Sequence, residues 1–277
     1  MSAIRVGVDI GGTKALLVAF AGTEVASVRR IDTGPTFCAA DFERELASFV
    51  ASLPAAPEAV GVAVPGIVDA QGRVVACDVL PGLDGWLFAL PGLRTAALND
   101  TAAALLAARQ DFAPDATAAL VMVGTAIGAA FQMNGVVAAG AKGWAGELGY
   151  MPVQAVNGTR HLDEVAGGAA LLKQCGLSAA ELSARLAEGD EAVRGAVHAA
   201  GHALGLALAT LVNLLNPDLI VLGGGTLSYA GYVNAALDSA QAWSFPALWQ
   251  CCRISVSAHG ERLVALGAAI AVAAAAP

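Results

Sequence analysis

The sequence VGVDIGGTK, residues 6–14, is the stretch that decides the fold of this chain. Residues 5–10 are apolar and rich in β-branched side chains, a glycine turn follows at 11–13, and residues 15–20 are apolar again. Two apolar runs joined by so short a glycine turn predict a β-hairpin. An ordinary hairpin turn is the structural alternative to any functional role for these glycines.

The residues around this turn are suited to binding an anion. Asp9 ends the first strand, and Thr13 and Lys14 follow the glycines Gly11 and Gly12. Backbone amides in a glycine turn can point together at an anion, because no Cβ blocks the approach. The Asp9 carboxylate can hold Mg²⁺, usually through water, while Thr13 and Lys14 can reach phosphate oxygens. The pattern GxxxxGK[ST] is absent and a strand follows the turn, so the turn is not a P-loop.

A second stretch repeats this pattern about 115 residues further along the chain. Residues 119–123 are apolar, GTAIG follows at 124–128, and residues 129–133 form another apolar run. Two such hairpins predict a duplicated fold in which each half holds one side of a phosphate chain. Gly124, Thr125 and Gly128 are the candidate phosphate contacts here, and a plain hairpin turn is again the alternative.

The remaining pattern alternates helices with strands, which predicts an α/β architecture. The expected helices are 41–53, 99–109, 191–215 and a C-terminal helix from 263, and the expected further strands are 59–64, 96–98 and 219–222. The long helix is expected to end at Asn216-Pro217, because proline cannot continue a helix.

Three further segments carry candidate functional residues. Asn99 and Asp100 open a helix, where the helix dipole favours an ionised carboxylate. The structural alternative to a functional role is that these residues cap the helix. Both roles are compatible, because one residue can cap the helix while the other faces a cleft. The glycines 223–225 end a buried strand and can let a flat ligand lie against the backbone, or simply make a tight connection. Glu147 lies in GELG and can accept hydrogen bonds from substrate hydroxyls, or be a solvated loop residue.

Composition excludes several classes of protein. The 277 residues are 57% hydrophobic and 14% charged, which excludes a disordered chain. The net charge of −8 argues against a nucleic-acid partner, which needs basic patches. No apolar run reaches the roughly 20 residues of a membrane span, and the stretch 263–277 is too short. No signal peptide precedes the first strand, so we expect a cytoplasmic protein without a membrane partner.

Cysteine and histidine usage indicates neither disulfides nor a metal site. The five cysteines form no CxxC pair, which is typical of reduced thiols. The histidines are dispersed, and His198 and His202, four residues apart, have no acidic or thiolate companion.

Together these segments resemble the ROK family (repressors, open reading frames and sugar kinases) of the actin-like ATPase superfamily. The matching segments are VGVDIGGTK at 6–14, GVAVPGIVDAQGRV at 61–74, LND at 98–100, VGTAIG at 123–128, GWAGELGY at 143–150 and NLLNPDLIVLGGG at 213–225. The resemblance implies a duplicated, ribonuclease H-like α/β fold with two domains and a cleft between them. We expect the domains at 1–98 and 99–261, with the C-terminal helix, about 262–277, packing back on the first.

The resemblance also implies roles for individual residues. The turns 9–14 and 124–128 hold the phosphates of ATP, with Mg²⁺ near Asp9, and Gly223, Gly224 and Gly225 border adenosine. Asp100 aligns with the catalytic base. The residues that align with sugar contacts are Asn99, Asp100, Glu147, Tyr150 and Asp163. A homodimer is expected from the family.

Three departures from the family pattern bear on these roles. Tyr150 stands where the family has a histidine, and residues 153–162 lack the family's cysteine cluster, so we expect no structural zinc. Ala126 adds a Cβ where the turn is expected to need a positive φ, which would weaken phosphate binding. The segment 77–86 lacks an asparagine often found there, so one sugar contact is expected to be either absent or replaced by Asp78 or Asp84.

The sequence therefore predicts ATP-dependent phosphorylation of a hexose or N-acylhexosamine at its 6-hydroxyl, with Asp100 as the general base. The alternative is a non-catalytic sugar or nucleotide sensor on the same fold. A kinase for a non-sugar acceptor is a further alternative. A ROK repressor is disfavoured, because the chain begins at the first strand and is acidic.

Overall fold

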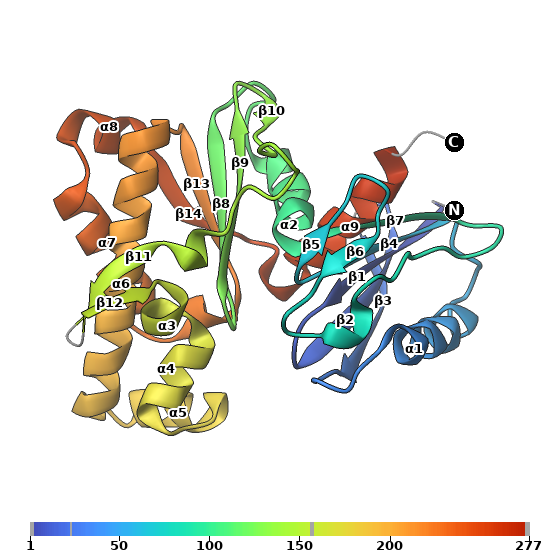
Figure 1. The fold of residues 1–277 in the computed structure, drawn as a ribbon, viewed down its shortest axis with the longest axis horizontal. Coiled ribbons are helices and arrows are strands. Elements are labelled where there is room, and N and C mark those ends of the chain that lie inside the picture. Colours follow the sequence, from blue (N-terminus) through green and yellow to red (C-terminus); the bar gives the residue numbers. More distant parts are fainter. Residues whose placement is uncertain (1–2, 23, 156–157, 275–277) are drawn as a thin grey trace. The chain divides into compact units, whose positions relative to one another are not determined.

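The computed structural model describes residues 3–22, 24–155 and 158–274, which form two compact units (Figure 1). Unit 1 contains the described residues of the ranges 3–111, 139–144 and 261–274, and unit 2 those of the ranges 112–138 and 145–260.

Unit 1 contains a five-stranded mixed sheet in the order β3-β2-β1-β4-β7. Its strands are β1 (Ile4–Ile10), β2 (Lys14–Ala21), β3 (Glu24–Asp32), β4 (Ala59–Val64) and β7 (Arg94–Asn99). Strand β2 pairs antiparallel with both β3 and β1, whereas β4 pairs parallel with β1 and β7 pairs parallel with β4. The predicted hairpin is confirmed, with Ile10 opposite Ala15 at its turn. The loop before β7 contains β5 (Ile67–Val68), β6 (Val74–Ala76) and the 3₁₀ turn η1 (Pro81–Leu83).

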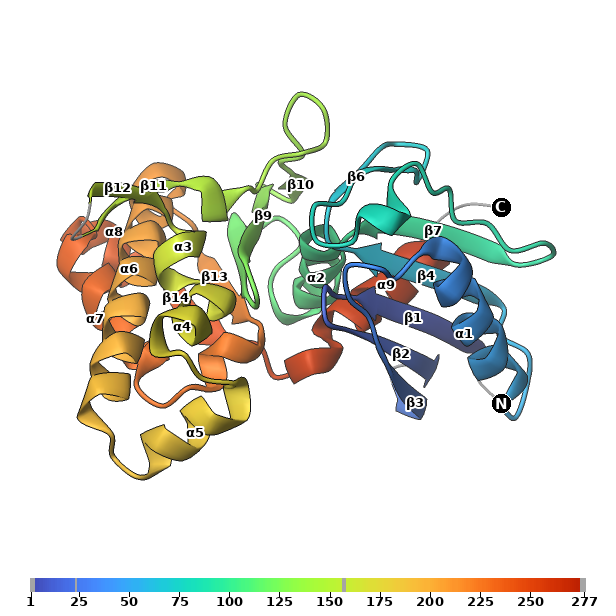
Figure 2. The same ribbon diagram turned by 60° about the horizontal axis from the view of Figure 1, so that its bottom comes forward.

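Helices cover both faces of this sheet. Helix α1 (Ala39–Ala51) packs Phe42, Leu46 and Phe49 into a core with the inward side chains of β1, β2 and β4. Helix α9 (Leu263–Ala274) packs on the opposite face against β1 and β4 (Figure 2). Gly7 allows this approach, because a Cβ there would lie 1.9 Å from the carbonyl oxygen of Ala265. The last three residues of the expected C-terminal helix, 275–277, lie outside the described residues.

Helix α2 (Asp100–Ala108) packs against α9 and therefore belongs to unit 1. The contact is close, since a Cβ at Gly267 would lie 1.7 Å from the carbonyl oxygen of Ala103. The first segment of this compact unit accordingly extends to Asp111, at the end of the 3₁₀ turn η2 (Arg109–Asp111).

The sheet of unit 2, β10-β9-β8-β13-β14, repeats the arrangement of unit 1. Its strands are β8 (Ala118–Val123), β9 (Ile127–Met133), β10 (Val136–Val137), β13 (Leu219–Gly223) and β14 (Arg253–Val256). Strands β10, β9 and β8 are antiparallel, and β13 and β14 run parallel to β8, as β4 and β7 do to β1. The duplication expected from the two glycine hairpins is therefore present in strand order and direction.

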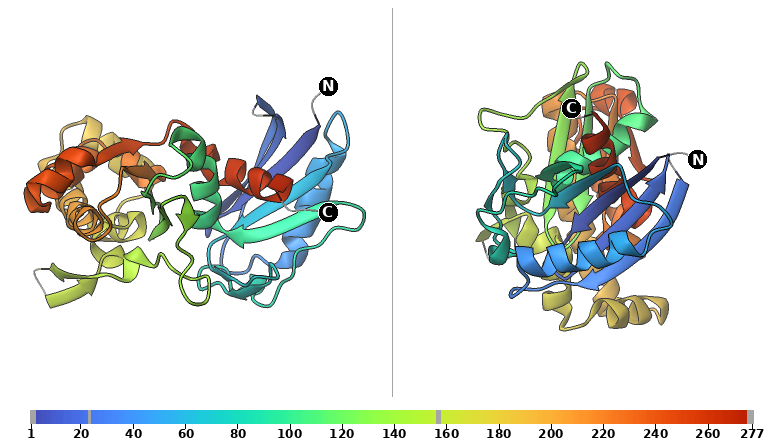
Figure 3. Two further views of the ribbon diagram at one scale, coloured as in Figure 1. Left: turned by 90° about the horizontal axis from the view of Figure 1, so that it is seen from above. Right: turned by 90° about the vertical axis from the view of Figure 1, so that its right-hand side faces the viewer.

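The core of unit 2 lies between this sheet and helix α6 (Glu191–Leu215), which crosses α7 (Tyr232–Trp243) closely at Gly201 and Gly205. As predicted, α6 ends before Asn216-Pro217: its last residue is Leu215, and its C-cap Asn216 adopts the left-handed conformation. Figure 3 gives two further views of the ribbon, and unit 2 also contains smaller elements. They are η3 (Leu148–Tyr150), β11 (Pro152–Ala155), β12 (Gly158–His161), α3 (Asp163–Ala166), α4 (Gly168–Cys175), α5 (Ala179–Ala187), η4 (Gly225–Ser228) and α8 (Pro246–Cys251), with η5 (Gly260–Arg262) leading into α9.

One helix of the described chain, α6, is long and apolar enough to cross a membrane by length and composition alone. In its apolar window, 56% of the residues are buried inside the protein, as in the core helix of a globular unit.

The α2–α9 contact leads to a prediction about stability. Replacing Gly267 with alanine places a Cβ against the Ala103 carbonyl, so we expect the free energy of unfolding to fall by about 1–3 kcal/mol. The matched control is Gly195→Ala in α6, where nothing lies within 4 Å of the new Cβ. That control should gain up to ~1 kcal/mol from helix propensity. Urea denaturation measures both, and equal stabilities of the two variants would contradict the prediction.

Candidate active site

Two carbonyl groups of the turn between β1 and β2, those of Gly11 and Thr13, accept hydrogen bonds from Thr33. The Gly11 amide donates to the Lys14 carbonyl at 2.9 Å, which closes the turn. The Thr33 hydroxyl donates to the Gly11 carbonyl at 2.6 Å, and the Thr33 amide donates to the Thr13 carbonyl at 3.1 Å. The amides of Gly12 and Thr13 have no acceptor among the residues that the structure describes. Such amides at the end of a strand are suited to binding an anion.

Two carboxylates lie near this turn, because β1 and β7 are parallel and end at the same edge of the sheet. Asp9 is the second-last residue of β1, and Asp100 directly follows β7. Burial raises the pKa of Asp9 from 3.8 to about 7, and the negative charge of Asp100 adds to this effect. The Lys14 ammonium lowers the pKa of Asp9, but less strongly. The structure thus brings together three residues that we selected from the sequence.

Asn99 is the cap of helix α2. Its side-chain oxygen accepts hydrogen bonds from the Thr101 amide at 2.9 Å and from the Ala102 amide at 3.3 Å. One N–H of its amide group donates to the Gly66 carbonyl at 2.8 Å. Asp100, the first residue of α2, accepts from the Thr101 amide at 2.7 Å. Asn99 therefore has the capping role that the sequence left open.

The loop that contains Gly66 is ordered by Asp84. This carboxylate accepts a hydrogen bond from the Cys77 amide at 2.8 Å, and the Cys77 thiol donates to the Pro65 carbonyl at 2.7 Å. Asp84 thus bonds to the loop on which Asn99 depends, and Asp78 and Asp84 are both exposed.

The turn between β8 and β9 in unit 2 is held in a similar way. The Gly124 carbonyl accepts from the Gly168 amide at 2.8 Å and from the Thr226 hydroxyl at 2.9 Å. The Thr125 carbonyl accepts from the Ala169 amide at 3.1 Å. The amides of Thr125 and Ala126 have no acceptor within the described parts of the chain.

The expectation that Ala126 needs a positive φ is wrong. Among the described residues other than glycine, positive φ occurs at Asn134 and Asn216 only. The turn closes instead through the Gly124 amide, which donates to the Ala126 carbonyl at 3.0 Å. The Cβ of Ala126 therefore adds no backbone strain.

Asp163 contacts this turn. Its Oδ1 accepts a hydrogen bond from the Ile127 amide at 2.5 Å. The carboxylate also lies against Gly149, where a Cβ would approach it to 2.3 Å. Burial raises the pKa of Asp163, and the Ile127 amide and His161 oppose the shift. A residue that the resemblance assigns to the sugar is thus bonded to the candidate phosphate turn.

Tyr150 and Glu147 are both exposed on the segment around η3. The Tyr150 ring lies 4.9 Å from the His161 ring, measured between centroids. Sequence reasoning missed His161, because only the pairing of β11 with β12 places it beside the position where the family has a histidine.

The glycines after β13 have different reasons for being glycine. Gly224 has a φ of 105°, and a Cβ there would lie 2.4 Å from the Val123 carbonyl oxygen, so the approach of this turn to β8 requires glycine. Gly225 has open space around it.

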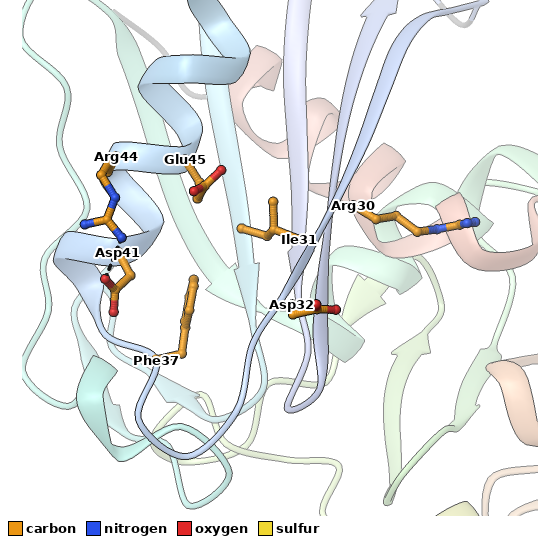
Figure 4. Close-up of a pocket in the computed structure, with 7 residues that line it drawn as sticks. All are labelled: Arg30, Ile31, Asp32, Phe37, Asp41, Arg44 and Glu45. Carbon is orange, nitrogen blue, oxygen red and sulfur yellow. Dashed lines mark hydrogen bonds and ion pairs between the residues drawn. The ribbon is translucent and has the colours of Figure 1, made fainter. Parts of the chain in front are cut away.

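The structure contains a cavity of about 400 Å³ elsewhere, between β3 and α1 (Figure 4). None of the predicted site residues lines it. Its lining residues are Arg30, Ile31, Asp32, Phe37, Asp41, Arg44 and Glu45. Among the described residues, no three His, Cys, Asp or Glu side chains are grouped as metal ligands.

A model of the ROK family matches residues 5–275 of this chain. The chain belongs to the ROK family. This ROK protein is 29% identical over 247 residues to a kanosamine kinase of Amycolatopsis mediterranei, with 80% of each chain covered. An uncharacterized protein of Clostridium perfringens is 33% identical over 119 residues, which span 40% of this chain and 39% of that relative.

The fold of this ROK protein is similar to that of a ROK family glucokinase from Streptomyces griseus, solved in complex with glucose and AMPPNP. The TM-score is 0.83 at 21% identity, with 97% of this chain and 99% of that chain covered. The similarity confirms the predicted actin-like fold with two α/β domains.

The raised pKa of Asp9 leads to a prediction for the protein without ligands. Below about pH 4 the carboxyl is protonated in the folded and unfolded states, and between pH 4 and 7 only the folded state keeps the proton. Stability is therefore lost as the pH rises to 7. Asp9→Asn removes this loss and should be more stable than the wild type at pH 8, by at most ~4 kcal/mol. The difference should shrink towards pH 4.

Urea denaturation in EDTA at several pH values measures this difference. Asp41→Asn is the control of opposite sign, because hydrogen bonds from Arg44 and Cys38 lower the pKa of Asp41. That variant should be less stable at neutral pH and approach the wild type as the pH falls. A pH-independent difference for Asp9→Asn would show that its carboxyl titrates normally.

Proposed function

We propose that this ROK protein transfers the γ-phosphoryl group of ATP to the 6-hydroxyl of a hexose or N-acylhexosamine. The observation that carries the proposal is the position of Asp100 at the start of α2. Its charge acts on Asp9, which lies beside a turn with two amides that have no acceptor among the described residues. Its family and its kanosamine kinase relative support a phosphotransferase that acts on sugars.

In the proposed reaction, the acceptor oxygen attacks the γ-phosphorus in line with the leaving oxygen. A bond forms between the acceptor oxygen and phosphorus, and the bond from phosphorus to the β,γ-bridging oxygen breaks to release ADP. Asp100 accepts the hydroxyl proton, a role that suits a carboxylate held at a helix start by the Thr101 amide.

The phosphates are bound by both glycine turns in this proposal. The donors to phosphate in unit 1 are the Gly12 and Thr13 amides and the Lys14 ammonium. The donors in unit 2 are the Thr125 and Ala126 amides. Gly11, Gly124 and Gly128 shape these turns, while Gly223, Gly224 and Gly225 border the adenosine.

A magnesium ion fits the acidic pair of unit 1. Asp9 is a partly buried carboxylate that the charge of Asp100 makes costly to ionise, and a divalent cation offsets that cost. Asp9 would hold the ion, usually through water, and the ion would neutralise charge on the transferred phosphate.

The sugar contacts proposed are Asn99, Asp100, Glu147, Tyr150 and Asp163. One side-chain N–H of Asn99 already donates to the Gly66 carbonyl, so Asn99 would contact the sugar through its other N–H. Oδ1 of Asp163 already accepts from the Ile127 amide, so Asp163 would contact the sugar through Oδ2. We further propose that the protein is a cytoplasmic homodimer. It would hold no structural zinc and bind neither nucleic acid nor a membrane.

A non-catalytic sensor is the second candidate. Tyr150 at the family's histidine position favours it, because a usual sugar neighbour is absent. The arrangement of Asp9, Lys14 and Asp100 argues against it, since a sensor needs no base beside its phosphate turn. The strain expected at Ala126 no longer supports it.

A coupled ADP-release assay tests the proposal. With Mg-ATP and glucose, mannose, fructose, allose, kanosamine, N-acetylglucosamine or N-acetylmannosamine, we expect turnover with at least one sugar. Asp100→Asn should lower that turnover by at least about a hundredfold, because it removes the proton acceptor. Calorimetry with Mg-AMPPNP should show nucleotide binding within about threefold of the wild type. Sugar binding without any turnover by the wild type would favour the sensor.

The protonation of Asp9 should appear in the kinetics. Because kcat/KM for Mg-ATP reports the free enzyme, it should fall about tenfold per pH unit below a pKa of about 7. Asp238→Asn, which removes an exposed carboxylate on α7, is the control and should keep the wild-type profile. A profile that stays flat from about pH 5.5 to 8 would show that Asp9 ionisation is not required.

A further inference from the structure

Each glycine turn receives a hydrogen bond from a threonine hydroxyl that lies outside it. In unit 1, the Thr33 hydroxyl donates to the Gly11 carbonyl at 2.6 Å. In unit 2, the Thr226 hydroxyl donates to the Gly124 carbonyl at 2.9 Å. Gly11 and Gly124 are both the first residues after the leading strand of their hairpins. The chain therefore uses the same contact twice, in the two halves of a duplicated fold.

The geometry of the peptide group gives this contact a consequence. A carbonyl and the amide that follows it lie in one planar unit and point in opposite directions when the peptide is trans. The described residues contain no cis peptide bond. A donor that holds the Gly11 carbonyl therefore orients the Gly12 amide away from Thr33, and a donor on the Gly124 carbonyl orients the Thr125 amide away from Thr226.

These are the amides that have no acceptor among the described residues. The next peptide of the unit 2 turn is held likewise, since the Thr125 carbonyl accepts from the Ala169 amide at 3.1 Å. Its Ala126 amide consequently points away from α4. The next peptide links Ala126 to Ile127. Its Ala126 carbonyl accepts a hydrogen bond from the Gly124 amide, and its Ile127 amide donates one to Asp163. Three successive peptide planes are thus held in place.

The surroundings of Thr226 show that its place is sterically defined. Thr226 is 5% exposed. A Cβ at Gly168 would lie 2.5 Å from the Thr226 Oγ1 and 2.6 Å from the Gly124 carbonyl oxygen. Glycine at 168 therefore lets the hydroxyl and the α4 backbone reach the same carbonyl. Thr33 is partly buried, and its own amide also bonds to the unit 1 turn, at the Thr13 carbonyl.

We propose that Thr33 and Thr226 are positioning residues for the phosphoryl donor, each orienting one backbone amide of its turn towards a phosphate oxygen. This inference rests on the proposed function in one respect, namely that the turns bind phosphate. An amide held in place before binding interacts more strongly with an anion than one that must first rotate into place.

Valine and serine variants separate the hydrogen bond from the packing. Thr33→Val and Thr226→Val keep the β-branched shape and remove the hydroxyl, whereas Thr33→Ser and Thr226→Ser keep the hydroxyl. Calorimetry with Mg-AMPPNP should show each valine variant binding about threefold to tenfold more weakly than the wild type. The serine variants should bind within about twofold of the wild type.

Two further probes test whether the effect is confined to the phosphates. Mg-tripolyphosphate should show the same loss in the valine variants as Mg-AMPPNP, whereas adenosine should bind equally well to all variants. In the kinase assay, KM for ATP should rise and KM for the sugar should stay within about twofold. Circular dichroism melting identifies a variant that fails to fold, and because the two threonines lie in different units, the other variant still tests the proposal.

The inference is overturned if both valine variants bind Mg-AMPPNP as the wild type does. It is also overturned if the serine variants lose as much affinity as the valine variants, or if adenosine binding falls in parallel, because packing would then explain the loss. A wild type that binds no Mg-AMPPNP or Mg-tripolyphosphate overturns it too. A wild type that binds nucleotide but phosphorylates no sugar contradicts the proposed function alone, and the valine effect still supports this inference.

Discussion

The planarity of the peptide bond is the constraint on which the candidate site depends. In both units, a hydrogen bond holds the carbonyl of the first turn glycine, and the amide on the other side of that peptide has no acceptor among the described residues. No basic cluster is needed to build such an anion site, which agrees with a chain that carries a net charge of −8. The phosphate specificity proposed here is therefore a property of the backbone, supported by threonines, glycines and the start of α4.

The acidic pair of unit 1 depends on packing far from the turn. Helix α9, near the C-terminal end of the chain, packs against β1, which carries Asp9, and against α2, which begins with Asp100. Gly7 and Gly267 permit both contacts, because any side chain there would overlap a backbone carbonyl. The resulting proximity and burial raise the pKa of Asp9 to about 7, so the free protein has a carboxylate whose ionisation a cation would favour.

The duplication of the fold explains why the two glycine turns are held by the same kind of hydrogen bond. The two turns nevertheless differ in the side chains that surround them. The unit 1 turn carries Lys14 and lies beside two carboxylates, whereas the unit 2 turn is held more extensively, by Thr226, Asp163 and the first amides of α4. This division fits a proposal in which unit 1 contributes the chemistry of the reacting groups. Unit 2 then contributes a firmly held contact for the donor.

The sequence by itself determined the elements that local patterns encode. The hairpin at 5–20, the helix that begins at Asp100 and the duplicated glycine turns follow from apolar runs, a capping asparagine and turn glycines, all within a few residues of one another. Tertiary structure decided the partners. Strand pairing and helix packing between distant segments create the threonine contacts of the two turns, the hydrogen bond from Ile127 to Asp163 and the contact between the His161 and Tyr150 rings. Hydrogen bonds and charge effects act over a few ångströms in space and leave no periodicity in a sequence, so only the folded chain could reveal them.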